Sequence, residues 1–348
     1  MKIQLNARNR AHHFDAAPND KILYAGLSSA VALPYECGSG TCGTCKARLL
    51  SGEIDDAWPE APGRKFLKGS DEFLMCQCSA RGDISVEVAA FVQEFEPGSC
   101  IPMAVAGVIS SSALLTHDVM QLQIDLDAPM EFDAGQFVLV RVPGVDGYRG
   151  WSMINYDRNT RSLRFVVKKK AGGNLSDWLF AQGRVGTAVE VFGPLGTATF
   201  YPSIAKNLLC IAGGSGIAGM MSILSRAAQE NYFADHSGEV FFGVRTMNDA
   251  FFLDEFTSLR KACGDKLKVT IALSDLAPTE GGVEVQNAHP LLTFETGFVH
   301  EVAGRRMQGR YEGVRAYLAG PSPAVDASVR MLLMARMSTA NIRYDKFS

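Results

Sequence analysis

The chain has 348 residues, a length that suggests two or three domains rather than one core. A formal net charge of −3 gives no overall basic surface for nucleic acid. No apolar run of about 18 residues occurs, and the start, MKIQLNARNR, lacks a signal-peptide core. We therefore expect a cytoplasmic protein that neither spans a membrane nor binds nucleic acid directly. Its eight cysteines should be metal ligands or core residues rather than disulfides.

Three cysteines lie close together near the N-terminus in CGSGTCGTC. Cys37, Cys42 and Cys45 have the spacing C-x4-C-x2-C, and the next cysteines are Cys76 and Cys78. Plant-type two-iron ferredoxins have this spacing followed by a distant fourth cysteine. The interleaved glycines permit the positive φ angles and close approach that wrapping a cluster requires. A structural zinc site more often pairs two short C-x2–4-C hairpins, so a [2Fe-2S] cluster is favoured over zinc.

The fourth ligand has two candidates in FLMCQCSA. Cys76 follows an apolar, strand-like stretch and precedes Gln77, as in ferredoxins of this type, so we favour Cys76 over Cys78. The alternating segment DISVEVAA reads as the last strand of the same module. Residues 1–95 are therefore predicted to form a β-grasp ferredoxin domain.

The second predicted domain covers residues 96–203. Short alternating segments separated by glycine and proline predict a Greek-key β-barrel. Within it, Gly172 and Gly173 lead through Ser176 into an amphipathic helix in AGGNLSDWLF. Such a turn can bind a pyrophosphate at the helix N-terminus, although many glycine-capped helices bind nothing.

The third predicted domain covers residues 204–348. The apolar strand in NLLCIAGG runs into Gly213-Gly214-Ser215-Gly216, and an apolar-periodic helix follows. A strand, a glycine turn and a helix form the dinucleotide-binding arrangement. Alternating strands and helices continue downstream, which predicts a doubly wound parallel sheet and, overall, a multidomain protein of α+β and α/β class.

With these three parts in order, the chain resembles the ferredoxin–NAD(P)H reductases of bacterial oxygenase systems over essentially its whole length. The resemblance implies an N-terminal ferredoxin domain, a flavin barrel and a nicotinamide domain. It also implies a [2Fe-2S] cluster, FAD and NAD(P)H as cofactors, and a ferredoxin or oxygenase component as partner.

The resemblance also assigns residues to the flavin. Arg149, Trp151 and Ser152 match the R-x-Y-S flavin motif. Arg149 would pair with the FAD pyrophosphate, whereas Trp151, in place of tyrosine, and Ser152, near flavin N5, would be the catalytic residues. The other flavin residues implied are Val167, Lys168, Gly172, Gly173, Ser176 and, unless it only anchors the C-terminus, Phe347.

The nicotinamide motifs depart from the family pattern. Gly213, Gly214, Ser215 and Gly216 match G-G-T-G, but Gly219 replaces the proline of G-G-T-G-x-x-P. The family's C-G-P-P is Ala319-Gly320-Pro321-Ser322 here. Together with Trp151, these changes predict that NAD(P)H reduces the flavin slowly or not at all.

Two functions therefore remain open from the sequence. One is an enzyme that passes electrons from NAD(P)H through FAD and the cluster to a ferredoxin or oxygenase. The other is a redox sensor that has lost NAD(P)H reactivity and regulates aromatic-degradation genes through a transcriptional activator. A zinc-stabilised binding module would need neither cofactor. Arg245 could bind a 2′-phosphate or be a solvated loop residue.

Overall fold

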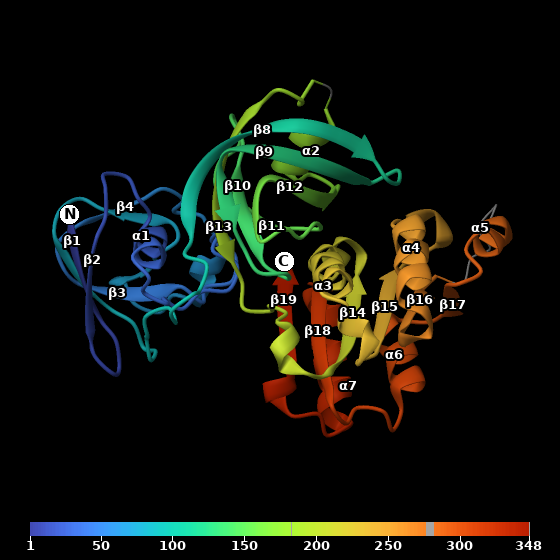
Figure 1. The fold of residues 1–348 in the computed structure, drawn as a ribbon. Coiled ribbons are helices and arrows are strands. Elements are labelled where there is room, and N and C mark those ends of the chain that lie inside the picture. The colour runs from blue at the N-terminus through green and yellow to red at the C-terminus, as the bar shows by residue number, and fades with distance from the viewer. Residues whose placement is uncertain (182, 276–281, 348) are drawn as a thin grey trace.

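The computed structural model describes residues 1–181, 183–275 and 282–347. Three sheets make up most of it: an N-terminal lobe in blue, a curled sheet in cyan and green, and a C-terminal lobe in yellow to red (Figure 1). Across the described residues no helix is long and apolar enough to cross a membrane. The predicted boundaries at residues 95/96 and 203/204 stay predictions.

The N-terminal lobe is a five-stranded sheet packed around the helix α1 (Ile22–Ser28). In β1, Ile3 and Leu5 are buried while Lys2 and Gln4 are exposed, as the period of two in a strand requires. β1 pairs in parallel with β7, and the other pairs are antiparallel. The strand order is β2 (Ala11–Asp15), β1 (Lys2–Asn6), β7 (Ile84–Glu87), β3 (Lys46–Ser51), β5 (Glu72–Leu74), with β4 (Ile54–Asp56) and β6 (Cys78–Ala80) as a separate pair.

The middle lobe is a curled antiparallel sheet of six strands, the barrel that the sequence predicts. Alternate residues of its long strands, such as Leu122, Ile124 and Leu126, fill the interior. The strand order is β11 (Arg149–Ser152), β10 (Phe137–Arg141), β13 (Ala188–Leu195), β8 (Met103–Leu114), β9 (Val119–Glu131), β12 (Asn159–Lys168). The short helix α2 (Asn174–Phe180) connects β12 to β13.

The C-terminal lobe is a parallel sheet with helices on both faces, which confirms the predicted doubly wound fold. Its strand order is β17 (Thr293–Thr296), β16 (Leu267–Leu273), β15 (Gly238–Val244), β14 (Asn207–Gly213), β18 (Val314–Pro321), β19 (Ile342–Phe347). The helices are α3 (Ile217–Gln229), α4 (Leu253–Cys263), α5 (Gly282–Ala288), α6 (Val299–Met307) and α7 (Ser322–Met334).

The central strand β14 is buried on both faces, which explains its continuous apolar sequence. Leu208 and Cys210 belong to the core on the α3 and α4 side, whereas Leu209 and Ile211 belong to the core on the α6 and α7 side. The strand order changes direction at β14, with β15 on one side and β18 on the other. In open parallel sheets the ligand cleft forms at such a switch point, at the carboxyl ends of the strands.

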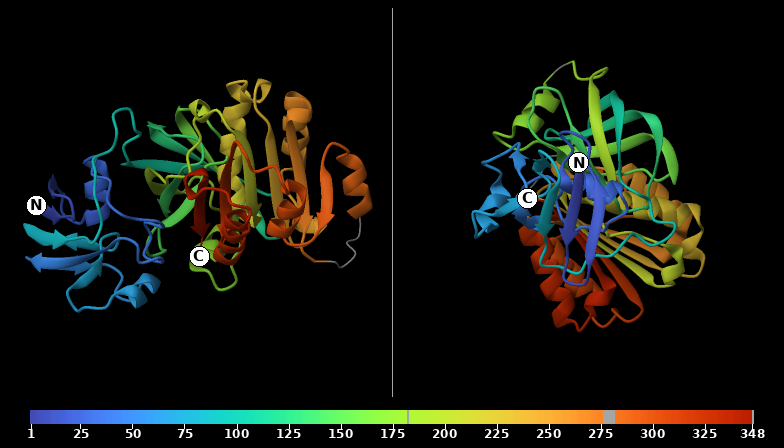
Figure 2. Two further views of the ribbon diagram at one scale, coloured as in Figure 1. Left: turned by 90° about the horizontal axis from the view of Figure 1, so that it is seen from below. Right: turned by 90° about the vertical axis from the view of Figure 1, so that its left-hand side faces the viewer.

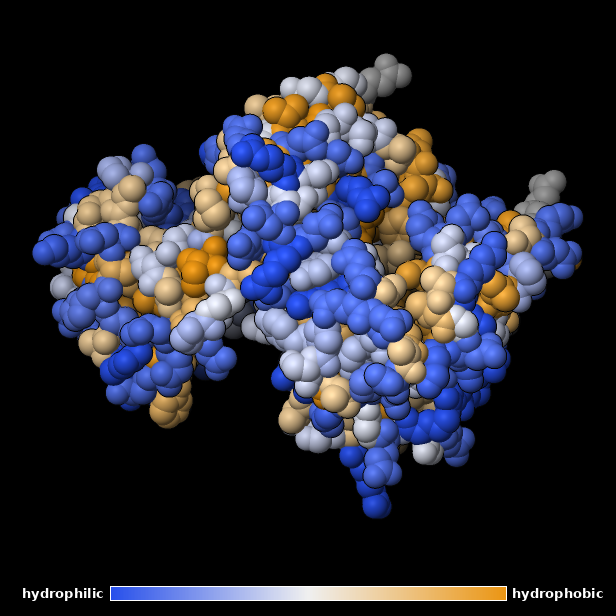
Figure 3. Space-filling model, viewed as in Figure 1, coloured by the Kyte–Doolittle hydropathy of each residue, from blue (hydrophilic) through white to orange (hydrophobic). Residues whose placement is uncertain are grey.

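The curled sheet joins the two other lobes. Phe137 and Phe192 from it pack into the N-terminal core, where the ring of Phe192 stacks on that of Tyr24 with 4.4 Å between centroids. On its other side, the sheet's interior is continuous with the core beneath α3 and α4. Figure 2 shows the resulting elongated molecule, with the N-terminal lobe and α5 at opposite ends. Polar residues cover most of the face seen in Figure 3.

Candidate cluster, flavin and nucleotide sites

The four predicted cluster ligands form two pairs of thiols. The Cys45 and Cys76 sulfurs lie 3.2 Å apart, and Cys37 forms a hydrogen-bonded pair with Cys42. Two irons that each need two protein thiolates fit this arrangement. Cys78 lies instead in β6, paired with Asp56 of β4. The geometry thus groups Cys76, and not Cys78, with the loop cysteines.

Backbone N–H groups converge on the pair formed by Cys37 and Cys42. The amides of Ser39, Thr41 and Cys42 each lie 3.4 Å from the Cys37 sulfur. These donors and, above all, the hydrogen bond with the Cys42 thiol lower the pKa of Cys37 to about 4. The same hydrogen bond raises the pKa of Cys42, so within this pair the loop favours the thiolate, the form that binds iron, at Cys37.

Glycines let the loop fold this tightly. Gly40 has φ of +88°, and a Cβ there would lie 2.9 Å from the Gln77 amide nitrogen. That amide in turn donates to the Cys76 sulfur at 3.3 Å. Gly43 has φ of +76°, and a Cβ would lie 2.6 Å from the ring of Phe66. Side chains at either glycine would displace groups that pack around the cysteines.

A cavity of about 280 Å³ separates the cysteine loop from the curled sheet and the C-terminal strand. Arg149 and Gly150 of β11 line it opposite Cys37. The Arg149 guanidinium stacks over Trp58 and donates to the Tyr148 carbonyl at 2.9 Å. The full lining is Glu36, Cys37, Ser39, Thr41, Trp58, Pro62, Phe137, Arg149, Gly150, Lys170, Asp345 and Lys346.

Arg149 has the properties of a residue that binds an anionic group. Among the described residues no carboxylate forms an ion pair with it, and burial lowers its pKa. A half-buried guanidinium without a counter-ion gains a charge-assisted contact when a phosphate enters. The cavity and Arg149 therefore fit part of an FAD; Lys170 and Lys346 are the other cations of the lining, and Glu36 and Asp345 are its carboxylates.

The predicted phosphate turn reaches this cavity through Lys170. Gly172 has φ of +68°, with open space where its Cβ would be. The Ser176 hydroxyl is turned inward, where it accepts from the Lys170 amide at 3.1 Å and lies 2.9 Å from the Gly173 carbonyl. In this structure Ser176 thus stabilises the turn, and its predicted contact with the cofactor stays a prediction.

The two predicted catalytic residues are both buried, but they pack against different parts of the molecule. Trp151 packs against Phe165 inside the curled sheet, with 5.6 Å between ring centroids, and lines neither the flavin cavity nor the nucleotide cleft described next. Ser152 lies against α3, because a Cβ built at Gly219 would be 3.9 Å from its hydroxyl oxygen. Ser152 is therefore at the contact between the curled sheet and the parallel-sheet lobe.

A second cleft of about 520 Å³ opens at the carboxyl ends of the parallel strands, where the switch point predicts it. It brings together seven of the predicted cofactor residues, including Lys168, whose contact with the flavin stays a prediction. These seven are Lys168, Gly213, Gly214, Ser215, Gly216, Arg245 and Gly320. The remaining lining residues are Gly243, Val244, Asp249, Phe251, Ala272, Ser274, Phe298, Val299, Pro321 and Ala324.

The glycine turn of this cleft packs closely against the end of β18. A Cβ at Gly216 would lie 2.6 Å from the carbonyl carbon of Ala319 and from the Cα of Gly320. Gly320 has φ of +137°, and a Cβ there would lie 2.9 Å from the Gly213 oxygen. Glycine is therefore required at both positions for the two backbones to approach. Ala319 is buried directly behind this contact.

Asp249 is a cleft residue that the sequence reading missed. Its carboxylate is 5 % exposed, and one oxygen, Oδ2, accepts from the amide and hydroxyl of Thr246. The other oxygen, Oδ1, is buried without a hydrogen-bond partner, 3.8 Å from the guanidinium of Arg245. The T-x-x-D capping pattern after β15 was the available signal.

Val167 and Phe347 are the remaining residues that were predicted to contact the flavin. Val167 is partly buried against the core of the curled sheet. Phe347 ends β19, where its backbone pairs with Pro321, and its side chain lies outside the described part of the chain.

The three lobes match three family models. Residues 5–81 match the 2Fe-2S iron-sulfur cluster binding domain, 106–200 the oxidoreductase FAD-binding domain and 210–329 the oxidoreductase NAD-binding domain. The protein is therefore an iron–sulfur flavoprotein with a nicotinamide nucleotide domain, which confirms the three predicted cofactors.

Relatives that align with almost the whole chain show which family of iron–sulfur flavoproteins it belongs to. The ferredoxin–NAD(P)+ reductase CarAd of Metapseudomonas resinovorans is 34 % identical over 337 residues, 94 % of each chain. The ferredoxin–NAD+ reductase component of the alkene monooxygenase system of Xanthobacter autotrophicus is 30 % identical, over 97 % of this chain and 99 % of its own. A solved ferredoxin reductase of carbazole 1,9a-dioxygenase superposes with a TM-score of 0.83 at 31 % identity, covering 100 % of this chain and 99 % of its own. The chain belongs to the ferredoxin–NAD(P)+ reductases of oxygenase systems, as its motifs predicted.

Proposed function

We propose that this protein takes electrons from a reduced nicotinamide nucleotide and delivers them singly, through its cluster, to the ferredoxin or oxygenase component of a bacterial oxygenase system. The observation that carries this proposal is the position of β11. Arg149 lines a cavity together with Cys37, and Ser152, three residues on, lies against Gly219 of the nucleotide-binding helix. One short strand therefore borders the cluster loop, the flavin cavity and the nucleotide lobe.

The flavin and cluster supply the hydride and one-electron chemistry when bound, and the chain supplies position and charge. Arg149 and Lys170 would neutralise the FAD phosphates, and the Ser152 hydroxyl would be a hydrogen-bond donor at the reacting edge of the flavin. Cys37, Cys42, Cys45 and Cys76 would be the cluster ligands. Gly213 to Gly216 would bring backbone N–H groups to the nucleotide pyrophosphate.

The substrates of the system are proposed from the relatives. Those named above serve carbazole and alkene oxidation, and a further relative is the electron transfer component XylA of xylene/toluene monooxygenase in Pseudomonas putida, 28 % identical over 99 % of this chain. We therefore propose that the partner oxygenase acts on an aromatic or similarly apolar hydrocarbon. A cytoplasmic location follows from this role.

The nucleotide we propose is NADH. The partnerless Oδ1 of Asp249 can accept a hydrogen bond from a ribose hydroxyl, whereas its negative charge would repel a 2′-phosphate. Arg245 lies beside it and is largely exposed. An arginine that is already close to a carboxylate is a weaker phosphate site than a free one.

The departures at Trp151, Gly219 and Ala319 led to the alternative of a regulator that does not react with NAD(P)H. That alternative stays a prediction, because no contact among the described residues favours it and the relatives named here are reductases or electron transfer components. The nucleotide cleft is open, and Gly219 has its neighbours at ordinary contact distances. We therefore favour the reductase.

The test uses two electron acceptors with the purified holoprotein. NADH should support reduction of ferricyanide, which accepts electrons from a flavin, and of cytochrome c, which accepts single electrons from the cluster. The Cys76→Ser variant should keep the first activity and lose most of the second. A holoprotein that reduces neither acceptor with NADH or NADPH is not a reductase.

A further inference from the structure

The contact between α3 and the turn at residues 133–136 of the curled sheet is buried and polar. Gly219, Ser222 and Arg226 lie on one face of α3, at i, i+3 and i+7. The fully buried Ser222 hydroxyl accepts from the Gly135 amide at 2.8 Å and donates to the Gly219 carbonyl at 2.9 Å. One side chain thus ties the first turn of the nucleotide-binding helix to the flavin lobe.

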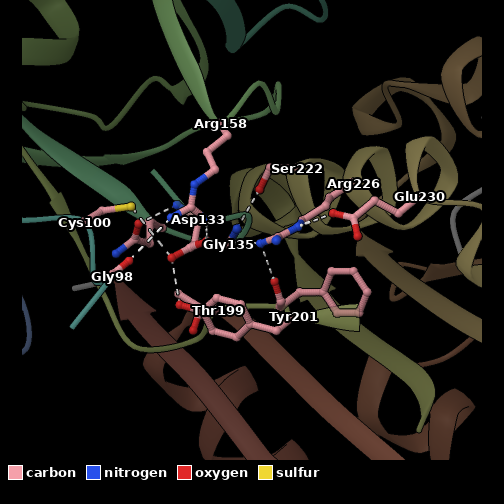
Figure 4. A network of polar contacts seen from close by, with 12 residues as sticks. Gly98, Cys100, Asp133, Gly135, Arg158, Thr199, Tyr201, Ser222, Arg226 and Glu230 are labelled. Carbon is pink, nitrogen blue, oxygen red and sulfur yellow. Dashed lines mark hydrogen bonds and ion pairs between the residues drawn. The ribbon is translucent and has the colours of Figure 1, made fainter. Parts of the chain in front are cut away.

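Arg226 makes the second polar contact between α3 and the curled sheet. Its guanidinium pairs with Asp133 at 3.1 Å, donates to the Phe200 carbonyl at 2.9 Å and pairs with Glu230 on its own helix at 2.8 Å (Figure 4). Asp133 is 3 % exposed and Arg226 8 %. Asp133 also accepts from Tyr201 at 2.7 Å. The pair therefore joins two lobes through a buried charge on each side.

A buried ion pair costs desolvation but fixes geometry when its remaining hydrogen bonds are satisfied. In this pair each member has further partners, as Figure 4 shows. Removing Arg226 would leave Asp133 with partners from its own lobe, Arg158 and Tyr201, and would break the ion pair to α3. The docking angle of α3 is therefore held by directional contacts as well as by apolar packing.

The same helix begins at the nucleotide turn. Arg226 lies seven residues beyond Gly219, which is about 10 Å along a helix. A tilt of about 6° around Arg226 would thus shift Gly219 by about 1 Å relative to Ser152. A misplacement of about 1 Å between reacting groups can reduce a rate about a hundredfold.

We propose that Asp133, Ser222 and Arg226 form a positioning latch that sets the distance between the reacting edge of the flavin, at Ser152, and the nucleotide turn of α3. The latch affects the rate of hydride transfer more than it affects the affinity for the nucleotide, because none of its three members lines the nucleotide cleft. It supplies the fixed helix entry that a proline supplies in the family motif. The proposal rests on the proposed reductase function.

The test compares Arg226→Gln with Arg158→Gln in the holoprotein. Arg158 also pairs with Asp133, at 3.2 Å, but belongs to the curled sheet and is half exposed, so its loss leaves the tie to α3 intact. Under anaerobic conditions with saturating NADH, Arg226→Gln should reduce the flavin at least about tenfold more slowly. Its NADH dissociation constant should change less than about threefold, and its flavin–nicotinamide charge-transfer absorbance should fall. Arg158→Gln should resemble the parent in all three. Dithionite reduction and FAD content establish that both variants are loaded.

Ser222→Ala is the milder second variant if Arg226→Gln does not fold, and it should show the same pattern to a smaller degree. Amide hydrogen exchange across residues 214–222 gives a readout that does not need nucleotide reactivity. Exchange there should rise in Arg226→Gln and Ser222→Ala but not in Arg158→Gln. A parent protein that NADH does not reduce refutes the reductase, while this exchange pattern still tests the latch. Unchanged flavin reduction in a loaded Arg226→Gln, or unchanged exchange, would overturn it.

Discussion

Gly219 of α3 faces Ser152 of β11 so closely that a Cβ at residue 219 would lie 3.8 Å from the Cβ of Ser152. This contact joins the lobe that binds the nucleotide to the strand that borders the flavin cavity. Although the proline of the family motif is missing at residue 219, the first turn of α3 is held on the curled sheet through Ser222, which accepts from Gly135 and donates to the Gly219 carbonyl.

Two glycines three residues apart should respond in opposite ways to alanine. Gly219→Ala places a methyl group 3.5 Å from the Gly135 oxygen, an ordinary contact, and should stabilise α3 by up to about 1 kcal/mol. Gly216→Ala places it 2.6 Å from the backbone of Ala319 and should destabilise the lobe and weaken nucleotide binding. Thermal unfolding and NADH titration of both variants check this. A Gly216→Ala variant as stable as Gly219→Ala would contradict the packing described.

The cluster ligands are tested by two serine variants. Cys76→Ser should lose the [2Fe-2S] cluster, because it removes the thiol 3.2 Å from Cys45. Cys78→Ser should retain it, because that thiol is buried in β6 with its pKa raised to about 12. Iron and sulfide content and the visible spectrum of the two purified proteins decide the matter. Loss of the cluster from Cys78→Ser alone would reverse the assignment.

Flavin binding should depend on Arg149 and not on a neighbouring arginine. Arg149→Ala should weaken FAD binding by about 10- to 100-fold, the range expected for a charge-assisted contact, and leave the cluster in place. Arg141 is the matched control: it lies on the adjacent strand and pairs with Glu190 at the surface. Flavin-to-protein ratios after gel filtration measure the effect. Full flavin retention in Arg149→Ala would show that the cavity is not the FAD site.

Nucleotide preference should depend on Asp249. Asp249→Asn removes the charge that would repel a 2′-phosphate, so the ratio of kcat/KM for NADPH over NADH should rise at least about tenfold. The exposed Asp254 provides the control variant Asp254→Asn, which should keep the parent ratio. A parent protein that already prefers NADPH would refute the role given to Asp249 and favour Arg245 as a phosphate site.

The parts of the site that the sequence revealed are local ones. The cysteine loop and the Gly213 to Gly216 turn have short-range spacings that determine their own conformation, and the structure brings each set together. The parts of the site that could not be predicted from the sequence depend on contacts between lobes. Arg226 and Asp133 are 93 residues apart and appear in no motif.

Three residues that were predicted from family position alone have surroundings that depend on the tertiary structure. Lys168 lies at the end of β12 and lines the cleft of the parallel-sheet lobe, and its contact with the flavin stays a prediction. The Ser176 hydroxyl turns into its own loop, where it accepts from the Lys170 amide and donates to the Lys170 carbonyl. The burial of Trp151 against Phe165 depends on how the sheet curls, which its local sequence does not specify.

We propose that this chain is a nicotinamide-dependent reductase whose cofactors lie in one electron path. The most direct measurement is anaerobic stopped-flow mixing of the holoprotein with NADH, following the flavin and cluster bands separately. We expect the flavin band to bleach first, the cluster band to follow, and NADPH to act more slowly. Bleaching by dithionite but by neither nucleotide would contradict the claim and leave a redox protein that takes its electrons from elsewhere.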